Sequence, residues 1–260
     1  MMILLALIQM GVVIWSRKTI QKVKLWTLQY LLKLVCLICG LKVIHLTGAS
    51  DNKEPGLLVC NHMSYLDILA IGSLFPVTFM AKLEISSWPL FGQVVALSDG
   101  IFVKREDIHS RVGAAFELSR TLKRHGVCIF PEGTTTQSGL PQPGAWQPGG
   151  FASASRAGVK VMSCGLAYSH PKAVAWYGDM ELVPHLWNML KVWHTEVVLV
   201  NDEIIPHSNE SGRAFAERVR QDVLEKVLIG EDFVNRSRSL VYPLKIRDTF
   251  GRLKQKLRAY

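Results

Sequence analysis

The chain has 260 residues, of which 49% are hydrophobic and 20% charged, a size that suits one α/β domain with a sizeable core. Its net charge of +9 is uneven, because residues 1–50 contribute +6 and residues 236–260 contribute +7, which leaves −4 for the 185 residues between them. No base-reading motif accompanies this charge, which argues against a nucleic-acid partner. Basic ends favour anionic lipid headgroups, which attract each nearby Lys or Arg by about 1 kcal/mol.

The N-terminus is predicted to associate with a membrane. Residues 1–15 are almost wholly apolar, but 15 helical residues span only about 22 Å of a hydrocarbon core of roughly 30 Å. The basic n-region and cleavage site of a signal peptide are missing. Residues 25–46 form a second apolar stretch, interrupted by Lys33 and Lys42. We expect an N-terminal membrane-anchoring helical hairpin, or a pair of interfacial helices, with one possible span. Positive charge after Trp15 is expected to keep the following domain on the cytoplasmic face. The alternative is a pair of core helices in a soluble domain.

A histidine and a carboxylate follow the next predicted element, a buried strand at residues 57–60. On one helix, a spacing of five residues would turn His62 and Asp67 about 140° apart. They can meet if His62 lies in a strand-to-helix turn and Asp67 in the first helical turn, with Ser64 as the N-cap. A nearby carboxylate fixes the imidazole tautomer and raises its basicity, so the pair is a candidate general base. The alternative is a capping histidine and a first-turn Asp favoured by the helix dipole.

Two further predicted strands end in polar residues. Residues 100–105 end in Lys104 and Arg105. The alternative is that these cations only protect the edge of the sheet from pairing with another strand. Residues 127–130 lead into Pro-Glu-Gly-Thr at 131–134, which is otherwise an ordinary turn with a solvated Glu. Open α/β sheets place their sites at the carboxyl ends of the strands, so we expect these residues to share one edge with His62.

Strands and helices alternate along the rest of the chain, which indicates an α/β fold with a mixed, largely parallel central sheet flanked by helices. Strands are expected at residues 77–80, 159–166 and 196–200, and helices at residues 107–125, 149–157 and 211–228. Ser211 is expected to cap the last helix. Residues 137–148, rich in Gly, Pro and Gln, are predicted to form a loop over the site.

The five cysteines are predicted to be reduced thiols on the cytosolic side. Their number is odd, they lie in apolar segments, and no zinc-ligand spacing occurs, so packing is their expected role: Cys36, Cys39, Cys60, Cys128 and Cys164. Several other residues receive no site role. Tyr168 and His185 have no partner at ligand spacing, and Trp176 and Trp187 are expected to be core or interfacial anchors.

In this order, the three motifs resemble the glycerolipid acyltransferase family, whose best-known members are the 1-acyl-glycerol-3-phosphate acyltransferases. His62 and Asp67 match its His-x-x-x-x-Asp motif, residues 130–134 match its Phe-Pro-Glu-Gly-Thr block, and residues 104–105 fall where it carries phosphate-binding cations. The resemblance spans roughly residues 55–170. It implies a catalytic pair, His62 and Asp67, and a set of substrate-binding residues: Asn61, Lys104, Arg105, Phe130, Pro131, Glu132, Gly133 and Thr134.

Two positions depart from the family pattern. Thr135 stands where the phosphatidic-acid-forming members usually carry Arg, and Ser163 stands where a strand usually carries Pro. The first change removes a cation from the expected phosphate pocket and casts doubt on lysophosphatidic acid as the acceptor. Threonine-rich versions look like enzymes that acylate lysophospholipids with larger headgroups, or bacterial lyso-ornithine lipid.

The resemblance implies a membrane-bound O-acyltransferase that moves a fatty acyl group from acyl-CoA or acyl carrier protein to the hydroxyl of a lyso-lipid. His62 would take the hydroxyl proton, Asp67 would steady the imidazolium, and the alkoxide would attack the thioester directly. No nucleophile elbow is present, so no acyl-enzyme is needed, and neither a cofactor nor a metal is implied.

The expected organisation is membrane-associated helices at residues 1–50, an acyltransferase domain at 51–230 and a basic tail at 231–260. Two alternatives remain. One is a lipid-binding or scaffolding protein of the same fold without turnover, and the other is a lipid or thioester hydrolase that uses the same pair on water.

Overall fold

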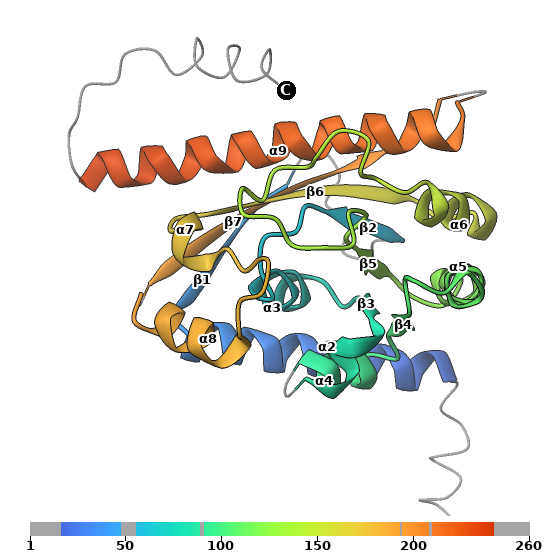
Figure 1. Cartoon of the computed structure of the whole chain (residues 1–260), viewed down its shortest axis with the longest axis horizontal. Coiled ribbons are helices and arrows are strands. Elements are labelled where there is room, and N and C mark those ends of the chain that lie inside the picture. The colour runs from blue at the N-terminus through green and yellow to red at the C-terminus, as the bar shows by residue number, and fades with distance from the viewer. Residues whose placement is uncertain (1–16, 48–55, 89–90, 193, 208–209, 242–260) are drawn as a thin grey trace, which may run out of the picture.

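The computed structural model describes residues 17–47, 56–88, 91–192, 194–207 and 210–241, which form a seven-stranded sheet flanked by helices (Figure 1). The strand order is β1-β7-β6-β2-β5-β3-β4, and every pairing is parallel except that of β6 with β7. The predicted mixed, largely parallel sheet is therefore confirmed. The strands are β1 Leu41–Thr47, β2 Leu57–Cys60, β3 Thr78–Lys82, β4 Ile101–Val103, β5 Val127–Ile129, β6 Val161–Tyr168 and β7 Thr195–Ile204.

Helices cover both faces of the sheet, and α9 lies on the opposite side from α2 (Figure 1). The helices are α2 Arg17–Ile38, α3 Leu66–Leu74, α4 Phe91–Leu97, α5 Ile108–Leu122, α6 Gly149–Ala157, α7 Pro171–Val174, α8 Leu182–Leu190 and α9 Gly212–Val241, with a 3₁₀ helix η1 at Leu83–Ser87. Two large clusters of buried side chains follow from this layering. One joins α2, α3, α4 and α8 to the sheet, and the other joins α5, α6 and α9 to it.

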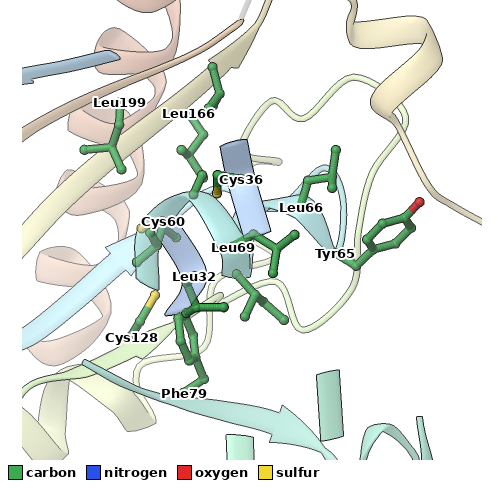
Figure 2. Packing of buried hydrophobic residues seen from close by; sticks show 14 of the residues in the cluster. Leu32, Cys36, Cys60, Tyr65, Leu66, Leu69, Phe79, Cys128, Leu166 and Leu199 are labelled. Atoms are coloured by element: carbon green, nitrogen blue, oxygen red, sulfur yellow. The ribbon is translucent and has the colours of Figure 1, made fainter. Parts of the chain in front are cut away.

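The first cluster packs α2 and α3 against the central strands (Figure 2). Leu32 of α2 is 1% exposed and lies beside Phe79 of β3 and Leu69 of α3. Strand β2 is buried along its whole length, as expected for a parallel strand covered on both faces. Because β2, β5 and β3 run parallel at the centre of the sheet, the loops that follow them meet at one edge, and this edge holds the candidate site.

The cysteines have the packing role that the sequence predicts. All five are free thiols, and four of them are buried. Burial raises the pKa of Cys36 to about 11 and also raises the pKa of Cys60 and Cys128, so these thiols stay protonated and unreactive at neutral pH.

The predicted N-terminal hairpin is not confirmed. Residues 1–15 lie outside the described residues, and α2 ends at Ile38, where Gly40 adopts a φ of 65° and turns the chain into β1. The prediction that residues 25–46 form one apolar helix is therefore wrong at its end, since residues 41–47 pair with β7 as the edge strand. Within the described part of the chain, no helix combines the length and apolar character that a membrane crossing requires.

Most other predicted elements are confirmed, with shifted ends. Ser211 Oγ accepts from the N–H of Ala214 at the start of α9, and α6 ends at Gly158 with a φ of 69°. Helix α9 continues to Val241, so the boundary predicted at residue 230 falls inside it. Helices α4, α7 and α8 were not predicted.

Candidate active site

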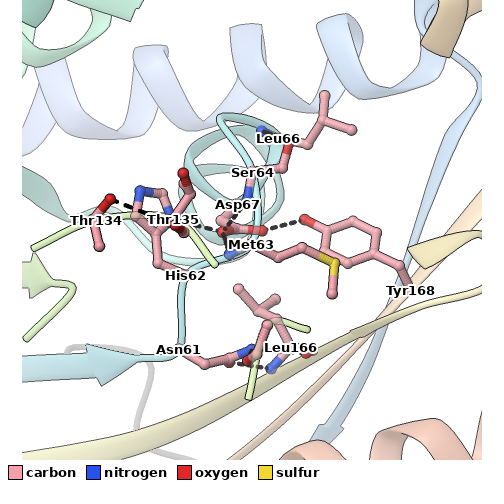
Figure 3. Close-up of polar contacts among 11 residues, drawn as sticks. Asn61, His62, Met63, Ser64, Leu66, Asp67, Thr134, Thr135, Leu166 and Tyr168 are labelled. Carbon is pink, nitrogen blue, oxygen red and sulfur yellow. Dashed lines mark hydrogen bonds and ion pairs between the residues drawn. The ribbon is translucent and has the colours of Figure 1, made fainter. Parts of the chain in front are cut away.

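The site is built on the turn between β2 and α3, and its centre is the buried carboxylate of Asp67 (Figure 3). His62 lies in this turn and Asp67 in the first turn of α3, so the two side chains meet as the sequence predicts. The His62 Nδ1 atom is 2.7 Å from Asp67 Oδ2. An ionised carboxylate can only accept, so Nδ1 carries the hydrogen, and the lone pair of the ring is on Nε2.

The Asp67 carboxylate is completely buried and is held by four donors. Besides His62, the backbone N–H groups of Met63 and Ser64 donate to Oδ2 at 2.8 and 3.0 Å, and the Tyr168 hydroxyl donates to Oδ1 at 2.6 Å. A buried charge is tolerated only when hydrogen bonds compensate for the lost water, and this arrangement supplies them. The carboxylate therefore keeps a fixed position from which it orients the imidazole.

The predicted N-cap role of Ser64 is wrong. The N-cap residue of α3 is Tyr65, whose side chain makes no capping hydrogen bond. Ser64 Oγ accepts from Leu66 N at a long 3.4 Å, whereas Asp67 takes the N–H groups of the preceding turn. The first-turn carboxylate replaces the serine because it is the stronger acceptor.

The His62 imidazole stacks on Phe130, the last residue before the Pro-Glu-Gly-Thr turn. The ring centroids are 3.9 Å apart and the planes differ by 13°. The His62 side chain is 17% exposed and lines a pocket of about 440 Å³. With Nδ1 bound to Asp67, Nε2 is the ring nitrogen that can take a proton from a molecule in this pocket.

Tyr168 is a site residue that the sequence analysis missed. It is 4% exposed at the end of β6, and burial together with the Asp67 charge raises the pKa of its hydroxyl well above the ordinary value. It therefore stays a hydrogen-bond donor. A signal was present, since a strand that runs parallel to β2 brings its last residue to the same edge of the sheet.

Asn61, predicted to bind substrate, belongs to the scaffold. It is 1% exposed, and its Nδ2 donates to the carbonyl oxygens of Gly139 and Leu166 at 2.8 and 3.1 Å. Its Oδ1 accepts from Leu166 N at 2.8 Å. The amide thus ties β2 to β6 and to the loop at 137–148, and no donor of its side chain is left for a ligand.

The two predicted cations at the end of β4 lie in different surroundings. Arg105 lines the pocket, its guanidinium lies against Gly133, and burial lowers its pKa, although it remains charged at neutral pH. Lys104 is exposed and does not line the pocket. Lys82, which was not predicted, lines the pocket and forms ion pairs with Glu84 at 3.1 Å and Glu106 at 3.7 Å.

The residues of the Pro-Glu-Gly-Thr turn after β5 have different surroundings. Gly133, with a φ of 75°, and Thr134 line the pocket, whereas Pro131 does not. Glu132 faces the loop at 137–148 instead of the pocket, because its Oε1 accepts from Gln142 N at 2.8 Å and from Trp146 Nε1 at 3.3 Å. Burial raises the pKa of Glu132. Glu132 thus holds the loop, and its contact with an acceptor stays a prediction.

The remaining wall of the pocket is apolar. Trp88 and Trp176 meet edge to face with centroids 5.1 Å apart, and Tyr65 lies 5.1 Å from Phe91. The pocket therefore combines charged side chains, Arg105 among them, with aromatic ones, and His62 lines the same pocket. A ligand that combines a charged headgroup with an acyl chain has matching chemistry.

A second cavity of about 480 Å³ lies at the opposite edge of the sheet, near Gly56 and His125. Burial and the nearby Arg124 lower the pKa of His125 to about 4, and neither ring nitrogen of His125 has a hydrogen-bond partner. No carboxylate faces an imidazole among its lining residues, so the cavity lacks the base that the first pocket contains.

The comparisons with known proteins agree with the geometry. A family model described as "Acyltransferase" matches residues 43–167. The chain is 30% identical to a lyso-ornithine lipid O-acyltransferase of Rhizobium meliloti, over 92% of this chain and 87% of that protein. The chain belongs to the glycerolipid acyltransferase family. It is also 32% identical to a lyso-ornithine lipid O-acyltransferase of Pseudomonas aeruginosa, over 68% of this chain and 69% of that one.

Other members of the glycerolipid acyltransferase family are also similar. A 1-acyl-sn-glycerol-3-phosphate acyltransferase of Neisseria gonorrhoeae is 33% identical over 55% of this chain and 58% of its own. The crystal structure of the 1-acyl-sn-glycerophosphate acyltransferase PlsC from Thermotoga maritima has the same fold, with a TM-score of 0.58 and 20% identity over 89% of this chain and 87% of that one. The family resemblance that the motifs indicate is confirmed, and the chain is an acyltransferase.

Proposed function

We propose that this acyltransferase transfers a fatty acyl group from a thioester, acyl-CoA or acyl carrier protein, to the hydroxyl of a membrane-embedded lyso-lipid. The observation that carries the proposal is the His62–Asp67 pair, whose imidazole lines a pocket that has both charged and apolar side chains in its wall. Nε2 of His62 takes the hydroxyl proton as the oxygen attacks the thioester carbonyl, and Asp67 stabilises the imidazolium. The C–S bond then breaks, and the proton passes to the departing thiolate.

The acceptor is proposed to be a lyso-lipid with a zwitterionic headgroup, lyso-ornithine lipid first among them, in preference to lysophosphatidic acid. The polar end of the pocket contains two cations, Lys82 and Arg105, but also two carboxylates, Glu84 and Glu106. These charges balance, and Thr135 adds none. A phosphate monoester carries up to two negative charges and would meet both carboxylates. An ornithine headgroup presents a carboxylate and an ammonium and can pair with both kinds of side chain.

Membrane association is part of the same proposal. Helix α2 exposes a row of large apolar side chains, among them Tyr30 at 63% and Leu37 at 72%. Lys22 and Lys33 on the same helix lie over the rings of Trp26 and Tyr30, which is typical of a helix at a lipid interface. Leu37→Glu should weaken binding to anionic vesicles. Deleting α2 would be uninformative because Leu32 is part of the core.

The test uses the purified full chain with labelled acyl-CoA or acyl carrier protein and four acceptors: lyso-ornithine lipid, lysophosphatidylethanolamine, lysophosphatidylcholine and lysophosphatidic acid. We expect the highest kcat/KM with lyso-ornithine lipid, and a loss of about 10²-fold or more in folded His62→Ala. A tenfold preference for lysophosphatidic acid would refute the charge-balance argument. Thiol release without any acceptor would identify a hydrolase, and absence of product with every acceptor would leave a lipid-binding protein.

A further inference from the structure

Exposed apolar side chains are concentrated on one side of the molecule. Of the eighteen exposed large hydrophobic residues among the described ones, thirteen lie on α2, η1, α4 and the segment 180–187. These elements cover the same face of the sheet, opposite α9 (Figure 1). A concentration of exposed apolar side chains on one side of a protein is typical of an interaction site.

Helix α8 contributes a separate part of this surface. Val183 and Trp187 are 73 and 66% exposed and lie four residues apart on one side of α8, and Met180, 37% exposed, lies just before the helix. These three residues are here named the α8 stripe. The inner side of α8 is fixed to the protein, because Met189 is buried in the core and Leu182, Leu186 and Leu190 pack against it. The stripe is thus a rigid apolar edge and not a frayed end. Lys191, the C-cap residue of α8, is exposed.

The α8 stripe is continuous with the wall of the catalytic pocket. Trp176 and Gly178, just before the stripe, line the pocket, and Trp176 Nε1 donates to the carbonyl oxygen of Met180 at 3.1 Å. On the inner side of α8, His185 Nδ1 lies 2.9 Å from the hydroxyl of Tyr65, which also lines the pocket. A molecule that slides along the stripe therefore reaches the apolar end of the pocket.

We infer that the α8 stripe is a second membrane contact, placed beside the pocket so that a lyso-lipid passes from the bilayer to His62 without crossing water. The inference rests on the proposed function, which requires an acceptor that resides in the membrane. Trp187 at the end of the stripe suits the headgroup region of a bilayer. Next to the stripe, the exposed Lys191 offsets only one of the two exposed acids, Asp179 and Glu181, so the positive charge of this side comes from another element. Helix α2, on the same side of the sheet, carries Lys22, Lys24 and Lys33, which provide this positive charge.

The experiment measures sedimentation of the full chain with vesicles of phosphatidylethanolamine and phosphatidylglycerol. Trp187→Glu and Val183→Glu place an acid on the α8 stripe, and we expect each to lower the partition coefficient about tenfold or more. Ile205→Glu is the matched control. Ile205 is 68% exposed, and its carbonyl oxygen accepts from Arg218 of α9 on the other side of the sheet. The partition coefficient of the Ile205→Glu variant should stay within about twofold of the wild-type value.

A second readout separates membrane contact from damage to the site. With a short-chain lyso-lipid below its micellar concentration, Trp187→Glu should keep the wild-type kcat/KM, whereas its KM for the same headgroup embedded in vesicles should rise about tenfold. Equal loss with both acceptors would show that α8 only supports the pocket, and it would overturn the inference. Unchanged vesicle binding in both α8 variants would do the same.

The oligomeric state is measured on the same samples by sedimentation velocity without lipid. A dimer that dissociates in Trp187→Glu would assign the stripe to a second copy of the chain and refute the membrane contact. Failure of the proposed function has a different signature, because vesicle binding would still respond to Trp187→Glu while no acceptor, soluble or embedded, is acylated.

Discussion

Replacing Asp67 by Asn tests the charge of the carboxylate separately from its geometry. The amide oxygen can occupy the Oδ2 position and keep the three donors there, from His62 Nδ1 and the N–H groups of Met63 and Ser64. The amide nitrogen then faces the Tyr168 hydroxyl, which can rotate and accept. We therefore expect a folded protein whose unfolding free energy changes by no more than about 1–2 kcal/mol.

The rate of acyl transfer should fall much more, because the imidazolium loses its counter-charge. The increase in the activation free energy should be at least about 1.5 kcal/mol, which is the gain from a charged instead of a neutral hydrogen-bond partner. It should be at most about 4 kcal/mol, which is the Coulomb attraction between unit charges about 4 Å apart at an effective dielectric constant of about 20. The corresponding decrease in kcat is between about tenfold and a thousandfold.

The assay is single-turnover acyl transfer with saturating acceptor, together with thermal unfolding of each variant. Asp222→Asn is the matched control, since Asp222 pairs with Lys226 on α9, far from the pocket, and its kcat should equal that of wild type. A folded Asp67→Asn protein with a kcat within about threefold of wild type would show that the negative charge does not assist the base. The His62–Asp67 contact would then be structural.

Three further results are expected. Tyr168→Phe removes a donor from a buried carboxylate and should lower the unfolding free energy by about 1.5–3 kcal/mol with a smaller loss of kcat than Asp67→Asn; wild-type stability in urea titration would contradict this. Arg105→Ala should raise the KM for the acceptor about tenfold and Lys104→Ala by less than about twofold, because of these two residues only Arg105 lines the pocket. A larger effect of Lys104→Ala in steady-state kinetics would be inconsistent with the site. The pKa of His125 in the folded protein is about 4, below its ordinary value near 6.5, so the unfolded chain binds the proton first and stability is lost as the pH falls from 6.5 to 4. The Tm of His125→Phe should therefore decrease less than that of wild type between pH 7 and 4.5. Equal decreases would exclude His125 as a cause.

The sequence predicts the centre of the site well because the decisive contact is local. His62 and Asp67 are five residues apart, and the strand pattern of residues 57–60 followed by a helix leaves one way for their side chains to meet. The sheet class follows from alternating apolar segments in the same manner. Strand β1 was not predicted because residues 41–46 continue the apolar pattern of the preceding helix. These residues form a strand because they pair with β7, which lies more than 150 residues later in the chain.

Contacts between distant segments account for the other differences. Tyr168 reaches Asp67 across 101 residues, and Lys82 enters the pocket because β3 and β4 are neighbours in the sheet. The role of Glu132 changes for the same reason, since its partners, Gln142 and Trp146, come from a loop whose path no local pattern specifies. Motif matching gives the residues of such a site, but the direction of each side chain is a property of the assembled fold.

Under the proposed function, the residues assigned to catalysis and those assigned to acceptor choice lie in different parts of the fold. The His62–Asp67 pair and the groups that donate to Asp67 come from β2, α3, the turn between them and the end of β6. These elements are buried, so packing fixes the geometry of the pair. The charges proposed to meet the headgroup come from the end of β3, from η1 and from the turn after β4, at the edge of the sheet, where substitutions disturb few core contacts. Acceptor preference can therefore change through Glu84 or Glu106 without loss of the base. Removing both carboxylates should shift the preference toward lysophosphatidic acid while kcat with a saturating acceptor stays the same, and a parallel loss of kcat would show that the two functions are not separable.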